Sequence, residues 1–305
     1  MLQSYDERNA DIRYWVNGVL RHRDEPGISP FDSAVQGGDA VWEGLRLYQG
    51  AIFGLTAHLA RLRRSATALN FGAVPGDAEI TEAITATLRA NRMYDGVHIR
   101  LTLTRGVKVT SGMDPRLNQS GPTLIVLAEH KAPVYDTTGL RLVTASVRRP
   151  GPDVLDPKIH HANLLNSILA KIEATAAGAD DAVMLDRRGF VAETNATHLF
   201  AVSGGSLVTP RTIACPAGIT RQTVLDLAAA AAIPAAVRDL SLAETYAADE
   251  VFCTGTMGEI AGVTVIDGRP IGGGLIGTLT TRIAALYQQH ARANGTRLLD
   301  QPDGS

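Results

Sequence analysis

The stretch over residues 156–200 constrains the fold more than any other part of the sequence. Its pattern predicts a polar loop (DPKIHHAN), a helix (LLNSILAKIEATAAG), a strand (DAVMLD), a turn (RRG) and the segment FVAETNATHLF. Pro157 biases Asp156 to an extended conformation, which keeps Lys158 out of a helix. A lysine amine at the end of a sheet, followed by a buried acid, suits covalent catalysis. A loop lysine on its own is more often a solvated charge.

Composition sets the class of protein. The 305 residues are 45% hydrophobic and 20% charged, which is enough apolar material for one large domain or two moderate ones. A net charge of −2 gives no reason to expect nucleic acid or an anionic membrane as partner. Residues 1–15 lack the pattern of a secretory signal, and no apolar run is long enough to span a bilayer. We therefore expect a cytoplasmic protein that acts on small molecules.

Two strands in the N-terminal half carry polar residues on one face. If residues 41–48 form a strand, its period of two separates Trp42, Gly44, Arg46 and Tyr48 from Val41, Glu43, Leu45 and Leu47. The segment GVHIRLTLTRG likewise places His98, Arg100, Thr102 and Thr104 opposite Ile99, Leu101 and Leu103. Either polar face could line a pocket, and an arginine beside a histidine could hold a carboxylate. An exposed sheet face fits equally well.

Amphipathic helices and loops complete the outline. Helices are predicted at 57–70, with Thr56 as N-cap, at 77–92 and at 276–291, and the polar tail from 294 is expected to fray. Residues 105–122 form a long loop of the kind that often serves as a lid. The stretch before residue 140 is polar and has no period, so we predict domains at 1–130 and 140–305 with a linker at 131–139. Without further information this supports an α/β or α+β protein of two domains.

Two turns could bind anions. Gly218, Ile219 and Thr220 precede a predicted helix, whose first N–H groups suit a phosphate. The turn at 254–258, which contains Thr256 and Met257, offers backbone and hydroxyl donors. Cys215 and Cys253 have no CxxC spacing, and the neighbouring pair His160 and His161 would need a third ligand such as His198, so we expect neither a disulfide nor a metal site.

The order of these motifs resembles that of the class IV, fold-type IV pyridoxal-phosphate aminotransferases, which include branched-chain and D-amino acid aminotransferases. The resemblance covers nearly the whole chain. Its motifs are WVNG, VWEGLRLY, HLARL, HIRLTLTRG, K-x4-N-L-L, AETNATHLF, PAGITR and TGTMGEI. It implies a small α+β domain and a larger α/β domain with pyridoxal 5'-phosphate between them, and a homodimer or higher oligomer in which a loop, such as 105–122, approaches the other subunit's pocket.

The resemblance also assigns residues. Lys158 matches the Schiff-base lysine and Glu193 the acid that pairs with the pyridine nitrogen. Arg61 matches an arginine on the cofactor phosphate, with Gly218, Ile219, Thr220 and Thr256 completing the phosphate site. Arg100 matches an arginine near the substrate carboxylate. The residues expected at the substrate are Trp42, Arg46, His98, Arg100 and Met257.

The activity implied is transfer of an amino group from an amino acid to a 2-oxo acid such as 2-oxoglutarate. The segments GLR and GTMGE favour branched-chain L-amino acids. Gly37 stands where branched-chain enzymes usually carry a tyrosine, and the spacing to Asn163 is one residue longer, so D-amino acids and (R)-amines remain alternatives. An aminodeoxychorismate lyase of the same fold and a non-catalytic binding protein are further alternatives.

Overall fold

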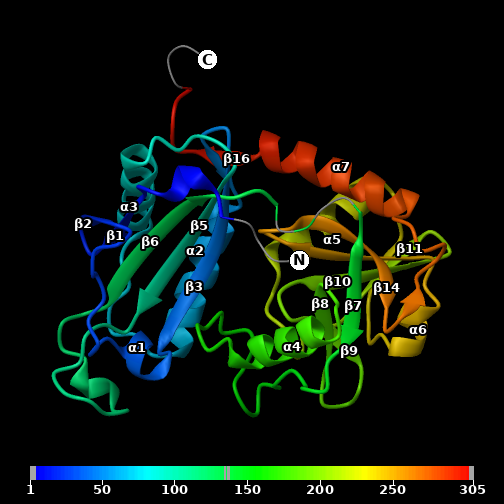
Figure 1. Cartoon of the computed structure of the whole chain (residues 1–305), viewed down its shortest axis with the longest axis horizontal. Coiled ribbons are helices and arrows are strands. Elements are labelled where there is room, and N and C mark those ends of the chain that lie inside the picture. Colours follow the sequence, from blue (N-terminus) through cyan, green and yellow to red (C-terminus); the bar gives the residue numbers. More distant parts are fainter. Residues whose placement is uncertain (1–4, 134, 136–137, 302–305) are drawn as a thin grey trace. The chain divides into compact units, whose positions relative to one another are not determined.

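The chain is described from a computed structural model that covers residues 5–133, 135 and 138–301 (Figure 1). By their contacts the residues form two compact units. The C-terminal unit contains Pro133–Lys158 and Leu164–His290, and the N-terminal unit contains residues 5–132, Ile159–Asn163 and residues 291–301. The sequence-based division placed 159–163 and 291–301 in the C-terminal part, whereas these two segments pack with the N-terminal unit. Two segments that follow residue 132 therefore belong to the N-terminal unit.

The N-terminal unit is built on one antiparallel sheet. Its strand order is β16-β4-β3-β5-β6-β1-β2. The strands are β1 (Arg13–Val16), β2 (Val19–His22), β3 (Ala40–Tyr48), β4 (Ala51–Phe53), β5 (Val97–Thr104), β6 (Thr123–His130) and β16 (Gly295–Arg297). The helical segments are η1 (Glu7–Asn9), α1 (Ser33–Gly37), α2 (Leu55–Ala68), α3 (Asp77–Ala90) and η2 (Pro115–Leu117).

The strand pleat decides where the helices of this unit pack. The face of β3 and β5 that carries Leu45, Leu47, Ile99 and Leu101 is fully buried under α2 and α3 (Figure 1). The helices contribute Leu59, Leu62, Ala66, Ile80, Ile84 and Leu88 to this core. The buried strand faces are those that the sequence predicted, so that prediction is confirmed. The opposite face of β3 and β5 carries the polar residues discussed below.

Two predictions for this unit are wrong at element ends. Thr56 does not cap α2; the N-cap is Gly54, whose φ of 68° lets the chain leave β4 and enter the helix within one residue. Residues 295–297 of the tail do not fray, because β16 pairs with β4 through Gly295–Phe53, Thr296–Ile52 and Arg297–Ala51. Polar composition alone could not show that the edge of β4 needed a partner.

The C-terminal unit contains a mixed sheet in the order β12-β11-β10-β13-β14-β7-β8-β9, with β15 paired to β14. The strands are β7 (Leu140–Thr144), β8 (Asp181–Leu185), β9 (Val191–Thr194), β10 (His198–Ser203), β11 (Ser206–Thr209), β12 (Ala235–Val237), β13 (Glu250–Gly255), β14 (Glu259–Ile266) and β15 (Arg269–Pro270). The helices are α4 (Leu165–Ala176), α5 (Ile219–Ala230), α6 (Leu242–Tyr246) and α7 (Thr278–Ala293).

Alternate residues of these strands enter different cores. Phe200 and Phe252 stack at 5.0 Å and pack with Val224 and Ala228 of α5 and Ile283 of α7. The other residues of β10 and β13 join a core with β7 and β8, and α4 packs Ala170 and Ala174 on β8. Helices packed on mixed and antiparallel sheets confirm the predicted α/β class.

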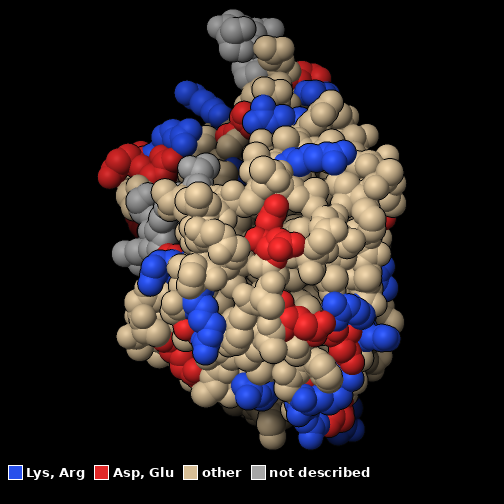
Figure 2. Space-filling model, turned by 90° about the vertical axis from the view of Figure 1, so that its right-hand side faces the viewer, with Lys and Arg blue, Asp and Glu red and all other residues tan. Residues whose placement is uncertain are grey.

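The surface and the helices add two observations. On the face shown in Figure 2, Lys and Arg side chains are interspersed with Asp and Glu side chains rather than gathered in one patch. Within the described residues, no helix is both long enough and apolar enough to cross a lipid bilayer.

Removal of residues 295–301 together with the four residues after them tests the role of β16. The shortened chain loses the pairing with β4 and the packing of Leu298 and Leu299 on the N-terminal core. We expect a loss of about 2–4 kcal/mol in the free energy of unfolding and a melting temperature lower by about 5 °C. Thermal melts followed by circular dichroism measure this, with removal of residues 302–305 alone as control. Equal melting temperatures for the two shortened chains would contradict the assignment of β16 as a stabilising strand.

Candidate active site

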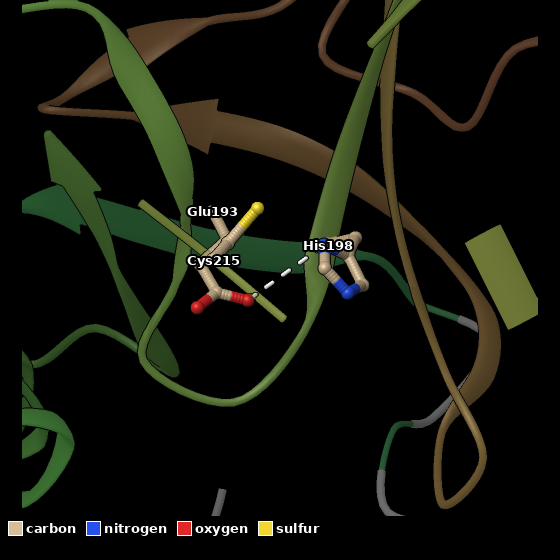
Figure 3. A group of neighbouring side chains, drawn as sticks. All are labelled: Glu193, His198 and Cys215. Atoms are coloured by element: carbon tan, nitrogen blue, oxygen red, sulfur yellow. Dashed lines mark ion pairs between the residues drawn. The ribbon is translucent and has the colours of Figure 1, made fainter. Parts of the chain in front are cut away.

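The predicted acid, Glu193, is buried and paired with a cation. It lies on β9 opposite Met184, and the residue is 3% exposed. Its Oε1 accepts a hydrogen bond from Nη2 of Arg149, whose Nη1 also donates to Oγ of Ser167 on α4 at 3.1 Å. The other carboxylate oxygen lies 3.7 Å from Nδ1 of His198, as the dashed line in Figure 3 shows. Burial of this carboxylate is possible because cationic and polar groups surround it.

His198 links this acid to the start of α5. It is the first residue of β10 and pairs with Thr254 of β13. A Cβ atom added to Gly218, the N-cap of α5, would lie 2.2 Å from Cδ2 of His198. Gly218 has a φ of −71°, so the close approach of the imidazole, rather than the backbone conformation, requires glycine here. The ends of β9, β10 and β13 and the start of α5 therefore meet around His198.

The start of α5 and the adjoining strand β13 carry hydrogen-bond donors that have no partner among the described residues. No side chain of the described residues caps the N-terminus of α5, which begins at Ile219 and Thr220. The hydroxyl of Thr254 is fully buried and has no hydrogen-bond partner among the described residues. Two residues further on, Thr256 and Met257 lie in the three-residue turn that joins β13 to β14. Uncapped helix N–H groups and hydroxyls are suited to bind an anion such as a phosphate.

The ring of Tyr135 packs against Gly258 in the turn at 256–258. A Cβ atom on Gly258 would lie 2.4 Å from Cδ2 of the Tyr135 ring. The Tyr135 hydroxyl donates to Oδ2 of Asp181 at 2.5 Å, and Asp181 also accepts from Lys171 and Asn195. Burial and the nearby Asp181 carboxylate raise the pKa of this hydroxyl, which keeps it protonated as a donor.

Lys158 lies in an exposed loop, as predicted. Its backbone N–H donates to Oδ1 of Asp156 at 2.9 Å, which fixes the turn after Pro157. Burial and the charge of Glu193 raise the pKa of the Cys215 thiol well above its ordinary value, while the charges of Arg221, Arg149 and Lys158 oppose this rise. The lysine is therefore within electrostatic reach of the cluster around Glu193.

A metal-binding interpretation of this cluster is weak. In the described part of the chain, Glu193, His198 and Cys215 are the group whose ligand atoms are close enough to share an ion, within 4.8 Å of one another (Figure 3). A metal would need the thiolate, but the raised pKa of Cys215 favours the thiol. The guanidinium of Arg149, bonded to the same carboxylate, repels a cation. The geometry therefore favours a hydrogen-bonding site for an organic ligand.

The N-terminal unit contains a second cluster, on the polar face of its sheet. In the register of β3 and β5, Arg46 lies opposite His98 and Gly44 opposite Arg100. The Arg100 guanidinium lies over the ring of Trp42, with Cζ 3.6 Å from the centroid. Four residues that the sequence assigned to substrate are thus neighbours on one sheet face.

This face is electropositive. Burial, and then the charges of Lys131, Arg100 and Arg46, lower the pKa of His98 to about 3, so its ring is neutral at pH 7. Neither ring nitrogen of His98 has a hydrogen-bond partner within the part of the chain that the structure describes. Burial also lowers the pKa of Arg100 to about 10, which leaves it protonated. A carboxylate placed here would gain charge-assisted hydrogen bonds.

Arg61, predicted to bind a phosphate, makes a buried ion pair within the N-terminal unit. Its Nε donates to Oε1 of Glu43 at 2.8 Å and its Nη2 donates to Oε2 at 2.6 Å. Nδ1 of His58 lies 2.6 Å from Oε2 of the same carboxylate. Burial alone would raise the pKa of Glu43, but the hydrogen bonds from Arg61 and His58 outweigh it and lower the pKa to about 2. The sequence did not predict this pairing.

The residues without an assigned role have packing contacts. His160 stacks on Trp42 with ring centroids 4.4 Å apart, and burial lowers its pKa to about 4. The carbonyl of His161 accepts a hydrogen bond from Nε1 of Trp42 at 3.1 Å. Asn163 donates to the carbonyl of Gly38, the C-cap of α1, at 2.7 Å. All three stabilise the N-terminal unit.

The structure thus brings together Lys158, Glu193, Gly218, Ile219, Thr220, Thr256 and Met257 in one unit, and Trp42, Arg46, Arg61, His98 and Arg100 in the other. Sequence reasoning missed Arg149, the cation on Glu193, and the role of His198 between that acid and α5. Two surface hollows, of about 530 and 460 Å³, are lined by none of the predicted residues.

Comparison with known proteins identifies the family. A family model described as amino-transferase class IV matches residues 40–266. The chain belongs to the class IV aminotransferases. The family predicted from the sequence is therefore confirmed.

Individual class IV aminotransferases resemble it over most of its length. A putative branched-chain-amino-acid aminotransferase of Methanocaldococcus jannaschii is 37% identical, over 95% of this chain and 100% of that protein. The crystal structure of the branched-chain amino acid aminotransferase from Thermobaculum terrenum in its PLP form has a TM-score of 0.85 at 27% identity and covers 96% of this chain and 100% of that chain. These similarities confirm the predicted fold.

A plant relative is longer. Branched-chain-amino-acid aminotransferase-like protein 2 of Arabidopsis thaliana is 53% identical over 94% of this chain but only 52% of its own length. The chain therefore spans about half the length of this relative.

Gly218→Ala tests the contact between His198 and α5. The new methyl group must displace the imidazole, which we expect to cost about 1–3 kcal/mol in the free energy of unfolding. Removing the ring with His198→Ala makes room, so the double variant should recover at least about 1 kcal/mol relative to additivity. Urea unfolding of the four proteins measures this coupling. Gly273→Ala, which meets no atom within 4 Å, is the matched control. Additive losses would contradict the close approach.

Glu43→Gln tests the buried ion pair through its pH dependence. The pKa of Glu43 falls from 4.5 to about 2 in the folded protein, so the pair contributes about 3 kcal/mol that is fully present above pH 4.5 and is lost as the pH falls toward 2. We expect the substitution to lower stability by about 3–5 kcal/mol at pH 7 and by less as the pH approaches 2. Thermal melts from pH 2 to 7 measure the difference. Glu79→Gln, at an exposed position of α3, is the control. A loss independent of pH would contradict this account.

Proposed function

We propose that this chain is a pyridoxal 5'-phosphate-dependent aminotransferase that moves an amino group between a branched-chain L-amino acid and a 2-oxo acid such as 2-oxoglutarate. The observation that carries the proposal lies within the C-terminal unit. A buried, cation-paired acid, an uncapped helix N-terminus, a buried hydroxyl without a partner among the described residues and a loop lysine within electrostatic reach converge there. When bound, pyridoxal 5'-phosphate supplies an electron sink for the carbanion formed at the substrate α-carbon.

The residues of this unit fit that cofactor. Glu193 would hold the pyridine nitrogen, because a buried carboxylate stabilises a protonated ring nitrogen. The N–H groups of Ile219 and Thr220 and the hydroxyl of Thr256 would hold the phosphate, which the dipole of α5 also favours. Thr254 offers a further hydroxyl that has no other partner among the described residues. For Arg61, contact with the phosphate stays a prediction, since two of its donors bind Glu43.

Lys158 is the proposed catalytic residue. Its amine would bind the cofactor between turnovers and, once released, take a proton from the substrate α-carbon as a general base. The loop that carries it is fixed by the bond from its own N–H to Asp156, which leaves the side chain exposed. Arg149 would keep Glu193 in place while this proton moves, since it bonds both Glu193 and Ser167.

Two observations support the proposed substrate. Amino donors and 2-oxo acids both carry a carboxylate, and the electropositive face formed by Arg46, His98 and Arg100 suits one. Branched-chain specificity is supported by the relatives from Methanocaldococcus jannaschii and Thermobaculum terrenum. A homodimer is part of the proposal.

A visible absorption spectrum of the protein with pyridoxal 5'-phosphate tests this function. We expect a bound-cofactor band that is lost in Lys158→Arg, which keeps the charge but cannot bind the aldehyde, and is retained in Lys131→Ala. Addition of L-leucine should bleach the band, and 2-oxoglutarate should restore it.

Other outcomes point to the alternatives or away from the family activity. Bleaching by D-alanine or (R)-1-phenylethylamine instead of L-leucine would move the assignment to those substrates. A band that no amine changes would favour the lyase. No band at all would contradict the proposal.

A further inference from the structure

A second buried carboxylate of the C-terminal unit lies at the start of β8 and has no role in the proposed function. Asp181 is the first residue of this strand and is 4% exposed. Its Oδ1 accepts hydrogen bonds from Nζ of Lys171 at 2.9 Å and from Nδ2 of Asn195 at 3.1 Å. Its Oδ2 accepts from the hydroxyl of Tyr135 at 2.5 Å. One acid therefore joins three separate segments of the unit to the start of β8.

Only one of these three contacts is needed for charge. A carboxylate taken out of water has to be paired, and Lys171 on α4 supplies the cation for Asp181. Tyr135 and Asn195 are neutral donors, so they do not balance the charge. Hydrogen bonds to an ionised acceptor are short and strong, which makes them effective in fixing the donor groups. The two neutral donors lead to opposite ends of the proposed cofactor site.

Asn195 connects Asp181 to the acid of the site. It follows β9 directly and stands two residues after Glu193. Its Oδ1 accepts from the N–H of Ala182 at 2.7 Å, and its own N–H donates to the Ala182 carbonyl at 2.9 Å. Because Nδ2 is bonded to Asp181, both ends of the side-chain amide have partners and its orientation is set. The end of β9, and with it Glu193, is thus fixed on the start of β8.

Tyr135 connects Asp181 to the turn at 256–258. Its ring fills the place beside Gly258 where a side chain would otherwise lie, since a Cβ atom there would meet the ring at 2.4 Å. The same turn contains Thr256, a proposed ligand of the phosphate. The hydrogen bond to Asp181 holds the ring in this place. The ring in turn limits the positions that the backbone of the turn can adopt.

On the basis of the proposed cofactor site, we propose that Asp181 is a positioning residue that sets the separation between Glu193 and the turn at 256–258. The ring nitrogen and the phosphate of pyridoxal 5'-phosphate belong to one small molecule and lie a fixed distance apart. The protein groups for its two ends bind it together only if they are held at the matching separation. Asp181 acts on one end through Asn195 and on the other through Tyr135.

Titration of the cofactor-free full chain with pyridoxal 5'-phosphate and with pyridoxal tests the two ends separately, because pyridoxal lacks the phosphate. Tyr135→Phe keeps the ring but loses the bond to Asp181. We expect it to weaken binding of pyridoxal 5'-phosphate about 10-fold and binding of pyridoxal less than about 2-fold. Asn195→Ala should weaken both ligands about 10-fold, because the acid that meets the shared ring is displaced. Asp181→Asn should combine the two losses.

Tyr14→Phe is the matched control. It also removes a hydroxyl that donates a hydrogen bond, to the Glu25 carbonyl at 2.8 Å, but in the N-terminal unit, so both affinities should stay unchanged. Circular dichroism checks that each variant folds, and Tyr135→Phe keeps the test decisive if Asp181→Asn does not.

Two results would overturn the positioning role while the unchanged chain still binds pyridoxal 5'-phosphate. One is a Tyr135→Phe variant that binds both ligands as the unchanged chain does, and the other is a Tyr135→Phe variant that loses affinity for both ligands equally. An unchanged chain that binds neither ligand would instead contradict the proposed cofactor site, and the positioning role with it.

Discussion

Each unit of this structure is arranged around a buried carboxylate that has to be paired. A buried acid without partners would cost several kcal/mol, so the fold must bring cations to it. In the N-terminal unit, Glu43 on β3 receives Arg61 and His58 from α2, which fixes the helix on the sheet. In the C-terminal unit, Glu193 receives Arg149, which in turn bonds α4. The first pair supports packing, whereas the second keeps an ionisable group near the uncapped start of α5, which we propose as an anion site.

The C-terminal site follows from how the elements around Glu193 end. His198 begins β10 beside this acid, and Gly218 lets the α5 N-terminus approach the imidazole. Thr254, which pairs with His198 from β13, and Thr256 in the β13–β14 turn add hydroxyls. An acid, an anion site and a lysine within reach are the groups that a cofactor with a ring nitrogen, a phosphate and an aldehyde requires. We therefore propose that the C-terminal unit contains the groups that bind this cofactor.

Much of this could be predicted from the sequence, because strand and helix periodicity are local. The opposite faces of β3 and β5 and the existence of α2 and α3 were predicted correctly. Contacts between residues that are far apart in the sequence were not predicted. The position of Glu43 among Val41, Leu45 and Leu47 signalled that a cation must meet it, but not that the cation is Arg61. No local sequence pattern indicated that Arg149 is the partner of Glu193. The pairing of β16 with β4 was not predicted for the same reason, because the two strands are far apart in the sequence.

The central claim, that Lys158 and the site around Glu193 hold pyridoxal 5'-phosphate, is tested most directly by locating the cofactor on the chain. The protein is incubated with the cofactor, reduced with borohydride, digested and analysed by mass spectrometry. The account predicts the phosphopyridoxyl mass on the peptide that contains Lys158, at one equivalent per chain. Labelling spread over Lys108, Lys131 and Lys171, or no labelling at Lys158, would contradict it.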